Sequence, residues 1–120
     1  MSSFSTSDLD EIIADRRERR ERERQFLLER AKQWLDEFSD EYGIETAYLF
    51  GSVTRPYRFH DDSDVDLAVE QIDMEGYFTA ISELSTYLER DVDIIQLDRC
   101  FFADRIRQTG ILWTKTPSPS

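Results

Sequence analysis

Two aspartates that are one residue apart, Asp64 and Asp66, stand at the start of a short apolar segment, residues 65–69. Side chains at positions i and i+2 of a strand project from the same face, so these two carboxylates are expected to lie close together. Carboxylates at that separation repel each other unless a cation lies between them. Oxygen ligands select hard cations, of which Mg²⁺ pairs most readily with phosphates. The spacing therefore favours a magnesium site; the alternative is that the aspartates only solubilise a loop.

Asp62 stands in the same relation to Asp64, so the sequence contains a second pair of this kind. We favour Asp64 and Asp66 because the apolar residues 67–69 make them the rigid end of a strand. Metal ligands are better positioned there than in a mobile loop.

A further carboxylate, Asp93, interrupts the apolar segment 92–97. We expect this side chain to be buried. Burial of an ionised carboxylate without a partner costs several kcal/mol, so Asp93 is expected to ligate a metal ion, to act as a base or to pair with an arginine. Asp91 lies outside the apolar segment and is expected to face solvent.

The pair Gly51-Ser52 follows directly on the apolar segment 46–50. Glycine lets the backbone turn and approach a ligand closely, and serine offers a hydroxyl and a possible helix cap. Exposed amides at such a turn suit phosphate oxygens. An ordinary turn remains the alternative, because this pair is common in turns.

The segments between these residues predict an α+β (α/β-like) fold, with helices packed on a small mixed sheet of about four strands. A long N-terminal helix is expected over residues 8–42, with Ser7 or Asp8 as its cap and Gly43 as its end. The other elements follow in the order strand 46–50, strand 65–69, a helix capped by Asp73 that runs to Leu88, strand 92–97, helix 100–108 and strand 111–114. Residues 8–115 are expected to form a single domain with a catalytic core at 44–115, and residues 1–7 and 116–120 are expected to be disordered.

Within the long helix, the Arg/Glu-rich residues 15–25 predict a solvated face, supported by Glu18 with Arg22 and Arg19 with Glu23 at i,i+4 spacing. The following half is predicted to pack on the core through residues that recur at helical spacing. These are Phe26, Leu27, Ala31, Trp34, Leu35 and Phe38. Leu9, Ile12 and Ile13 form an apolar patch ahead of the charged residues, and they either bind a partner or pack locally.

The formal charge of −11 argues against nucleic acid as a direct ligand, because such binding depends on Lys and Arg neutralising phosphates. A triphosphate is still compatible, since metal ions supply positive charge. The single cysteine, Cys100, allows no internal disulfide, and no membrane span or export signal is evident. A cytoplasmic protein is expected.

Together these motifs resemble the minimal nucleotidyltransferase (MNT) branch of the superfamily related to DNA polymerase beta. The family pattern is Gly-Ser, a loop, Asp-x-Asp-Leu on a strand, and a further Asp on a later strand. Here it reads Gly51-Ser52, Asp64-Val-Asp66-Leu and Val-Asp93-Ile-Ile, and the resemblance extends over residues 26–114. The loop between Ser52 and Asp64 contains eleven residues, longer than in the family, and Pro56 stands where the family usually has glycine.

The resemblance implies attack of an acceptor hydroxyl on the α-phosphate of ATP. Asp64, Asp66 and Asp93 are the expected catalytic residues and ligands of two Mg²⁺ ions, and Asp93 would also help to deprotonate the acceptor. Gly51 and Ser52 would hold the β- and γ-phosphates, and Arg55 would reach the triphosphate. His60, in the same loop, is expected to be exposed and is given no role.

Small members of this branch typically pair with a HEPN-domain toxin, an RNase, and silence it by adenylylating a tyrosine or by binding it. The resemblance therefore implies an antitoxin that transfers AMP to a cognate HEPN toxin. Two alternatives remain open: an antitoxin that acts by occlusion with little catalysis, and a stand-alone nucleotidyltransferase acting on a small molecule.

Overall fold

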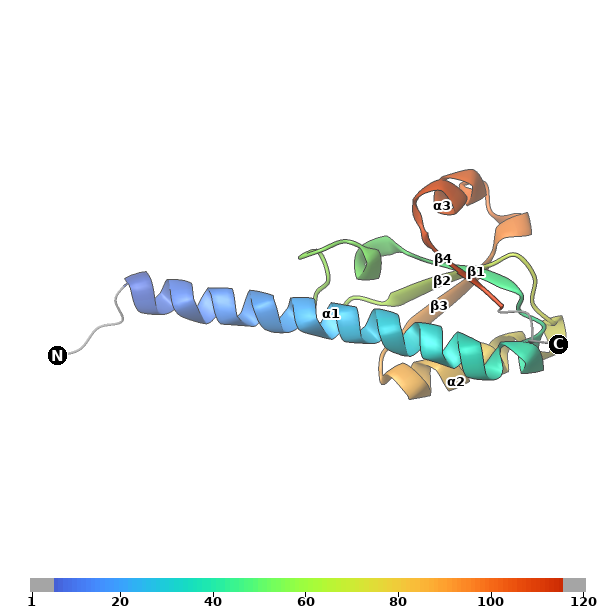
Figure 1. Ribbon diagram of the computed structural model, residues 1–120, viewed down its shortest axis with the longest axis horizontal. Coiled ribbons are helices and arrows are strands. Elements are labelled where there is room, and N and C mark those ends of the chain that lie inside the picture. Colours follow the sequence, from blue (N-terminus) through green and yellow to red (C-terminus); the bar gives the residue numbers. More distant parts are fainter. Residues whose placement is uncertain (1–5, 116–120) are drawn as a thin grey trace.

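The computed structural model describes residues 6–115, which form three α-helices, three short 3-10 turns and one four-stranded mixed sheet (Figure 1). The helices are α1 (Thr6–Tyr42), α2 (Tyr77–Leu88) and α3 (Ala103–Thr109), and the strands are β1 (Thr46–Phe50), β2 (Val65–Val69), β3 (Val92–Gln96) and β4 (Ile111–Thr114). The predicted α+β class, the mixed sheet and the long N-terminal helix are confirmed.

The strands lie in the order β3-β2-β1-β4. β1 is antiparallel to both β2 and β4, whereas β2 and β3 are parallel and are joined through α2. A parallel pair needs such a crossover connection. The register places Phe50 of β1 beside Asp66 of β2, and Asp66 beside Asp93 of β3. Residues in register share a face, so this pairing lines up three side chains across the sheet.

The two faces of the sheet are covered unequally. α1 and α2 cover one face, where Val65, Leu67 and Val69 of β2 join the larger hydrophobic cluster. Among residues 6–115, the opposite face receives only α3, whose Ala103 and Ile106 form a smaller cluster with Ala68 and Leu97. Alternate residues of β2 thus point to different clusters, as the two-residue period of a strand requires. Figure 1 shows α3 alone above the sheet and the other two helices below it.

The second half of α1 packs on the core as predicted. The side chains that it buries recur at helical spacing: Leu27, Ala31, Trp34 and Leu35. Phe26 is a correction, because its side chain is 61% exposed on the opposite side of the helix. The helix ends at Gly43, whose φ of +69° breaks the helical path. It begins at Thr6, two residues ahead of the predicted start. Residues 1–5 and 116–120, which were predicted to be disordered, lie outside the described residues.

Other boundaries differ more. The segment after Asp73 forms a 3-10 turn, Met74–Gly76, before α2 begins at Tyr77, and the Asp73 side chain makes no capping hydrogen bond. The third strand ends at Gln96, and α3 starts at Ala103 rather than at residue 100. Within residues 6–115, no helix is long and apolar enough to cross a membrane.

The charged segment of α1 is not uniformly solvated, which corrects the prediction for residues 15–25. Glu21 and Arg24 are buried, and the Arg24 Nε atom lies 3.0 Å from Glu21 Oε2. Arg24 Nη1 also donates to the carbonyl oxygen of Val53 at 3.0 Å, and Glu21 Oε2 accepts from the Tyr57 amide at 2.8 Å. The hydrogen bond from Arg24 is the main cause that lowers the pKa of Glu21 to about 2. The pair therefore fastens the loop after β1 to α1.

The i,i+4 pairs predicted in this segment do not form in the described structure. Glu23 instead contacts Arg90 Nη2 at 2.7 Å, and Glu18 accepts a hydrogen bond from the Tyr57 hydroxyl at 3.3 Å. Both partners come from outside the helix, so tertiary contacts replace the local ones.

Replacing Arg24 by alanine is expected to destabilise the protein by about 3–5 kcal/mol, because Glu21 would keep a buried charge without its partner. The difference from wild type should shrink as pH falls from about 4.5 towards 2, since the lowered pKa of Glu21 contributes stability only while the carboxyl is ionised. Urea unfolding with amide exchange at Tyr57 measures both effects. Arg22→Ala, at an exposed position, is the matched control; equal losses in the two variants would contradict the role of the pair.

Candidate active site

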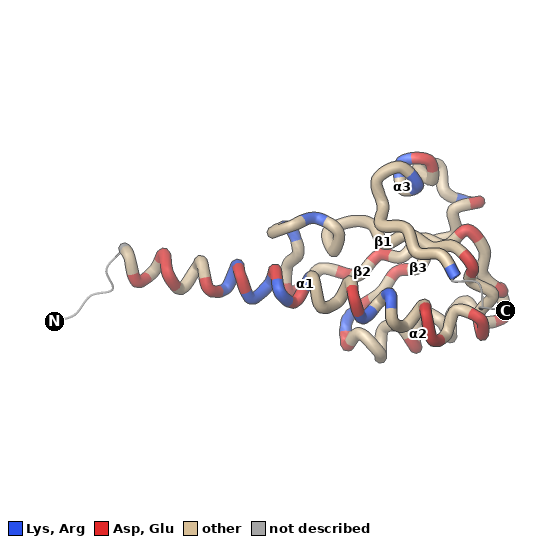
Figure 2. The backbone as a smooth tube through the Cα atoms, in the orientation of Figure 1, with Lys and Arg blue, Asp and Glu red and all other residues tan. Residues whose placement is uncertain are grey.

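Three carboxylates meet on the α3 face of the sheet. Asp66 lies in register with Asp93 on the neighbouring strand, and Asp64 precedes Asp66 by two residues. α3 covers only part of this face, so Asp64 and Asp93 are exposed and Asp66 is half-buried. Figure 2 shows the acidic positions of β2 and β3 next to each other in the sheet. The three aspartates that the sequence singled out therefore lie on one face, near enough for the charges of Asp64 and Asp93 to raise the pKa of Asp66.

The exposure of Asp93 corrects the expectation that it is buried. β3 is one of the two edge strands, and Asp93 precedes Ile95, the residue of that strand that packs under α3. Only Ile94, which points to the other face, is fully buried in β3. Asp93 has no ion pair with an arginine within residues 6–115, so the carboxylate remains available to a ligand. Asp91 is exposed, as predicted.

The electrostatics of the site centre on Asp66. Burial, followed by the charges of Asp93 and Asp64, raises the pKa of its carboxyl to about 6. Tyr77, at the start of α2, also has a raised pKa, caused by burial and then by Asp93. The hydroxyl of Tyr77 donates to the carbonyl oxygen of Ile94. The site therefore holds an excess of negative charge that a cation would offset.

Gly51 closes the site from the side of β1. Its φ is +77°, in the left-handed region that is unfavourable for residues other than glycine. A Cβ atom at this position would also lie 2.4 Å from Asp66 Oδ2. Both observations require glycine here, and the backbone of Gly51 consequently lies against the Asp66 carboxylate.

A 3-10 turn, Gly51–Thr54, follows β1. The Thr54 hydroxyl donates to the Gly51 carbonyl oxygen at 2.7 Å, and the Arg55 amide donates to the Ser52 carbonyl oxygen at 3.1 Å. The first amides of such a turn find no acceptor inside it, so they suit an anionic oxygen. Ser52 is half-buried next to Gly51, whereas the Arg55 side chain is exposed and forms no ion pair within the described residues. Ser52 thus lies at the site, and Arg55 is not held at it.

The loop that leads to Asp64 is fixed by Arg90, whose side chain is 10% exposed. Its Nη1 atom donates to the carbonyl oxygens of His60, at 3.3 Å, and Ser63, at 3.4 Å, and its guanidinium stacks 4.5 Å from the centre of the Phe59 ring. His60 is exposed, as expected. No sequence pattern predicts this role for Arg90, because its acceptors are backbone carbonyl oxygens about thirty residues away.

The donor set agrees with one class of cation. Within residues 6–115, no three or more His, Cys, Asp or Glu side chains are gathered closely enough to hold a metal ion by themselves. Mg²⁺ is usually held by one or two carboxylates together with substrate phosphates and water, so a complete protein cage is not required. The raised pKa of Asp66, caused in part by two neighbouring aspartates, indicates unbalanced negative charge at the site. A bound Mg²⁺ ion would compensate this charge. Asp64, Asp66 and Asp93 therefore fit as partial ligands of Mg²⁺.

Asp66→Asn is expected to raise the melting temperature by about 2–4 °C near pH 8, because it removes a repulsive charge that is partly screened by water. The pKa of Asp66 is higher in the folded than in the unfolded state, so ionisation of this carboxyl makes folding less favourable. The gain in melting temperature of Asp66→Asn should therefore vanish as pH falls from about 6 towards 4, where the carboxyl becomes protonated. Calorimetry across this pH range measures the effect. Asp62→Asn, in the exposed loop, is the control; a gain that does not depend on pH would contradict the explanation.

Gly51→Ala is expected to cost about 1–3 kcal/mol, from the positive φ and from the clash with Asp66. A double-mutant cycle separates the two causes. In an Asp66→Ala background, only the backbone penalty should remain, and the cost should be smaller. Denaturant unfolding of the four proteins gives the coupling; the same cost in both backgrounds would mean that Gly51 and Asp66 do not interact.

Comparison with known protein families matches residues 32–116 to the family described as Polymerase beta, Nucleotidyltransferase. The match covers well over half of the 120 residues and includes every residue of the site. No curated protein matches, and no solved structure matches. The chain therefore belongs to the polymerase-beta nucleotidyltransferase family.

Proposed function

We propose that this protein transfers AMP from Mg-ATP to a hydroxyl group of a partner protein, a tyrosine of a cognate HEPN toxin, and thereby acts as an antitoxin. The observation that carries the proposal is the alignment of Asp66 with Asp93, beside Gly51 at the end of the adjacent strand. Family membership supports nucleotidyl transfer. The branch and the toxin partner rest on the sequence resemblance alone.

In this mechanism the residues of the site bind the metal ions, bind the phosphates or accept a proton. Asp64, Asp66 and Asp93 would hold two Mg²⁺ ions, and Gly51 and Ser52 would bind the β- and γ-phosphates through their turn. Bound Mg²⁺ supplies positive charge to the triphosphate and to the leaving pyrophosphate. Asp93 is exposed, so its carboxylate can also accept the proton of an incoming hydroxyl.

The openness of the site supports a macromolecular acceptor. Asp64 and Asp93 are exposed, and among the described residues only the small helix α3 lies on their face of the sheet. A hydroxyl on the surface of another protein can approach such a site, whereas a small acceptor would find few side chains to orient it. Arg55, exposed at the rim, is the residue that would contact the triphosphate.

The test uses [α-³²P]ATP and the full chain, co-expressed with a candidate HEPN-domain partner, which is sought first in the neighbouring genes. Label is expected to pass to the partner in a Mg²⁺-dependent reaction. The double variant Asp64→Asn with Asp66→Asn should reduce transfer by at least about 100-fold, because it removes two metal ligands. Asp62→Asn, a loop aspartate outside the site, is the matched control and should transfer normally.

Three outcomes would overturn the proposal in different ways. Neutralisation of the partner without any label transfer would favour an antitoxin that acts by occlusion. Label on a free hydroxylated compound in the absence of partner would favour a stand-alone enzyme. Transfer that persists in the double variant would exclude the assigned carboxylates.

A further inference from the structure

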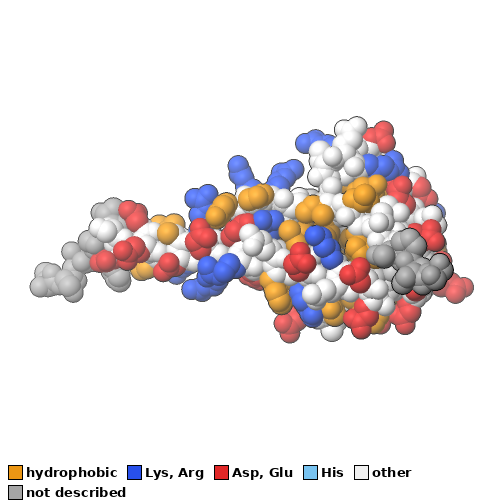
Figure 3. All heavy atoms as spheres, viewed as in Figure 1, with side chains coloured by type: hydrophobic (Ala, Val, Ile, Leu, Met, Phe, Trp, Pro, Cys, Tyr) orange, Lys and Arg blue, Asp and Glu red, His pale blue; other side chains and the backbone are white. Residues whose placement is uncertain are grey.

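The first half of α1 has an apolar and charged surface that no other described element covers. Residues 7–19 are all exposed, among them Leu9 at 52%, Ile12 at 39% and Ile13 at 55%. Figure 1 shows this part of the helix projecting beyond the sheet, and Figure 3 shows hydrophobic side chains on it between acidic and basic ones. Large aliphatic side chains grouped on one helix are typical of a contact surface.

These residues continue the stripe that packs on the core. In the second half of α1 the buried stripe contains Leu27, Ala31 and Trp34. Steps of three or four residues lead back from it through Arg24, Arg20, Arg16, Ile13 and Leu9. Positions at such steps lie on one side of a helix. The projecting half therefore presents the same face as the packed half, and in place of the sheet the loop at residues 56–61 approaches it near Arg17 and Arg20.

Charge is divided along the same helix. Residues 8–15 contain four acidic residues and no basic one, whereas residues 16–24 contain six arginines and three glutamates. Figure 2 shows the acidic part towards the N-terminus and the basic part behind it. A helix with this polarity is complementary to an antiparallel copy of itself, because each acidic part then meets a basic part.

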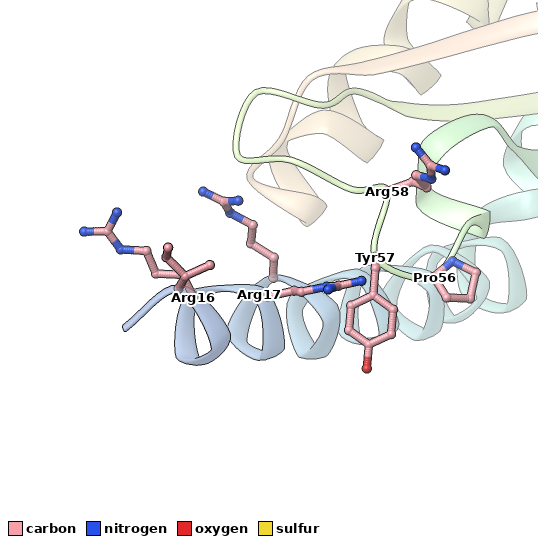
Figure 4. Close-up of a pocket in the computed structure, with 7 residues that line it drawn as sticks. Arg16, Arg17, Pro56, Tyr57 and Arg58 are labelled. Atoms are coloured by element: carbon pink, nitrogen blue, oxygen red, sulfur yellow. The ribbon is translucent and has the colours of Figure 1, made fainter. Parts of the chain in front are cut away.

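A hollow of about 630 Å³ lies beside the basic part, between α1 and the turn at residues 56–58. Ile13, Arg16, Arg17 and Arg20 line it from the helix, and Tyr57 lines it from the turn (Figure 4). The guanidinium of Arg17 lies 4.6 Å from the centre of the Tyr57 ring, which holds its charge at the edge of the hollow. The hollow joins apolar surface to three arginines of one helix, so it suits a segment with both aliphatic and acidic side chains.

We propose that two copies of the chain associate through antiparallel first halves of α1, with the two-fold axis between Ile13 and Ala14. Asp10 of each copy then lies opposite Arg17 of the other, and Leu9 and Ile12 approach the hollow of the other copy. The overlap of residues 6–21 extends over about 24 Å of helix. Nucleic acid is disfavoured on this surface because the neighbouring residues 8–15 are acidic. The proposal does not depend on nucleotidyl transfer.

A charge-swap experiment with the full chain tests the pairing. In a homodimer of Asp10→Arg, the new arginine of each copy faces Arg17 of the other copy. In a homodimer of Arg17→Asp, the new aspartate of each copy faces Asp10 of the other. Each variant alone should dissociate at least about tenfold more readily than wild type in sedimentation velocity. An equimolar mixture should regain wild-type association as a mixed dimer, in which both pairs are again of opposite charge. Loss of folding in one variant cannot produce this recovery.

Neighbouring positions provide the matched controls. Glu11→Arg and Arg22→Asp make the same changes of charge on parts of α1 that point away from the stripe, so association should stay at the wild-type level. A wild-type chain that sediments as a monomer at its highest soluble concentration would overturn the proposal. Failure of the two variants to regain association on mixing would also overturn it. Binding of a short single-stranded RNA to the arginines of a monomeric chain would overturn it in favour of a nucleic-acid surface.

Cysteine cross-linking tests the direction of the helices. In a Cys100→Ser background, Ile13→Cys should form a disulfide-linked dimer, because the two substituted positions lie next to the axis. Leu9→Cys should not, since the two positions would be about 13 Å apart along the helix axis. Cross-linking of both variants would indicate parallel helices, and cross-linking of neither would overturn the interface.

Discussion

The carboxylate of Asp66 is confined between two other carboxylates and the backbone of Gly51. Asp64 and Asp93 raise its pKa in addition to burial, and a Cβ on Gly51 would lie 2.4 Å from its Oδ2 atom. Relief of this crowding would require β1, β2 or β3 to shift, and the hydrogen-bonded register of the sheet opposes such a shift. The unbalanced negative charge is therefore built into the sheet, and positive charge has to come from a ligand.

The sheet tolerates the repulsion between these carboxylates because one of its faces forms the core and the other is largely open to solvent. The face covered by α1 and α2 contains the larger hydrophobic cluster, including Trp34, Leu35 and Leu67, which supplies most of the burial. The opposite face is covered by α3 at one end only, and the other end holds the aspartates. Polar groups on an open face keep part of their hydration, so the cost of gathering three carboxylates there is smaller than it would be in the core.

The sequence predicted the positions of the helices and strands better than the burial and tertiary contacts of their side chains. Each strand was found because its short apolar segment is bounded by glycine, aspartate or a loop, and Gly43 correctly marked the end of α1. The exposure of Asp93 was missed because an apolar segment does not reveal that its strand lies at an edge of the sheet. The burial of Glu21 and Arg24 was missed because their further partners, the Tyr57 amide and the Val53 carbonyl, lie 36 and 29 residues away in sequence. Contacts of this kind depend on tertiary structure, which helical periodicity does not contain.

The Glu21–Arg24 pair also marks the point at which α1 changes its role. On its C-terminal side the helix packs on the core, and on its N-terminal side residues 7–19 are exposed. The same two side chains hold Val53 and Tyr57, which follow directly on the Gly51-Ser52 turn. A molecule bound to the projecting half would therefore act on a helix that is joined to the site by buried, charge-assisted hydrogen bonds. The loop after β1 is thus the segment that joins α1 to the Gly51-Ser52 turn beside Asp66.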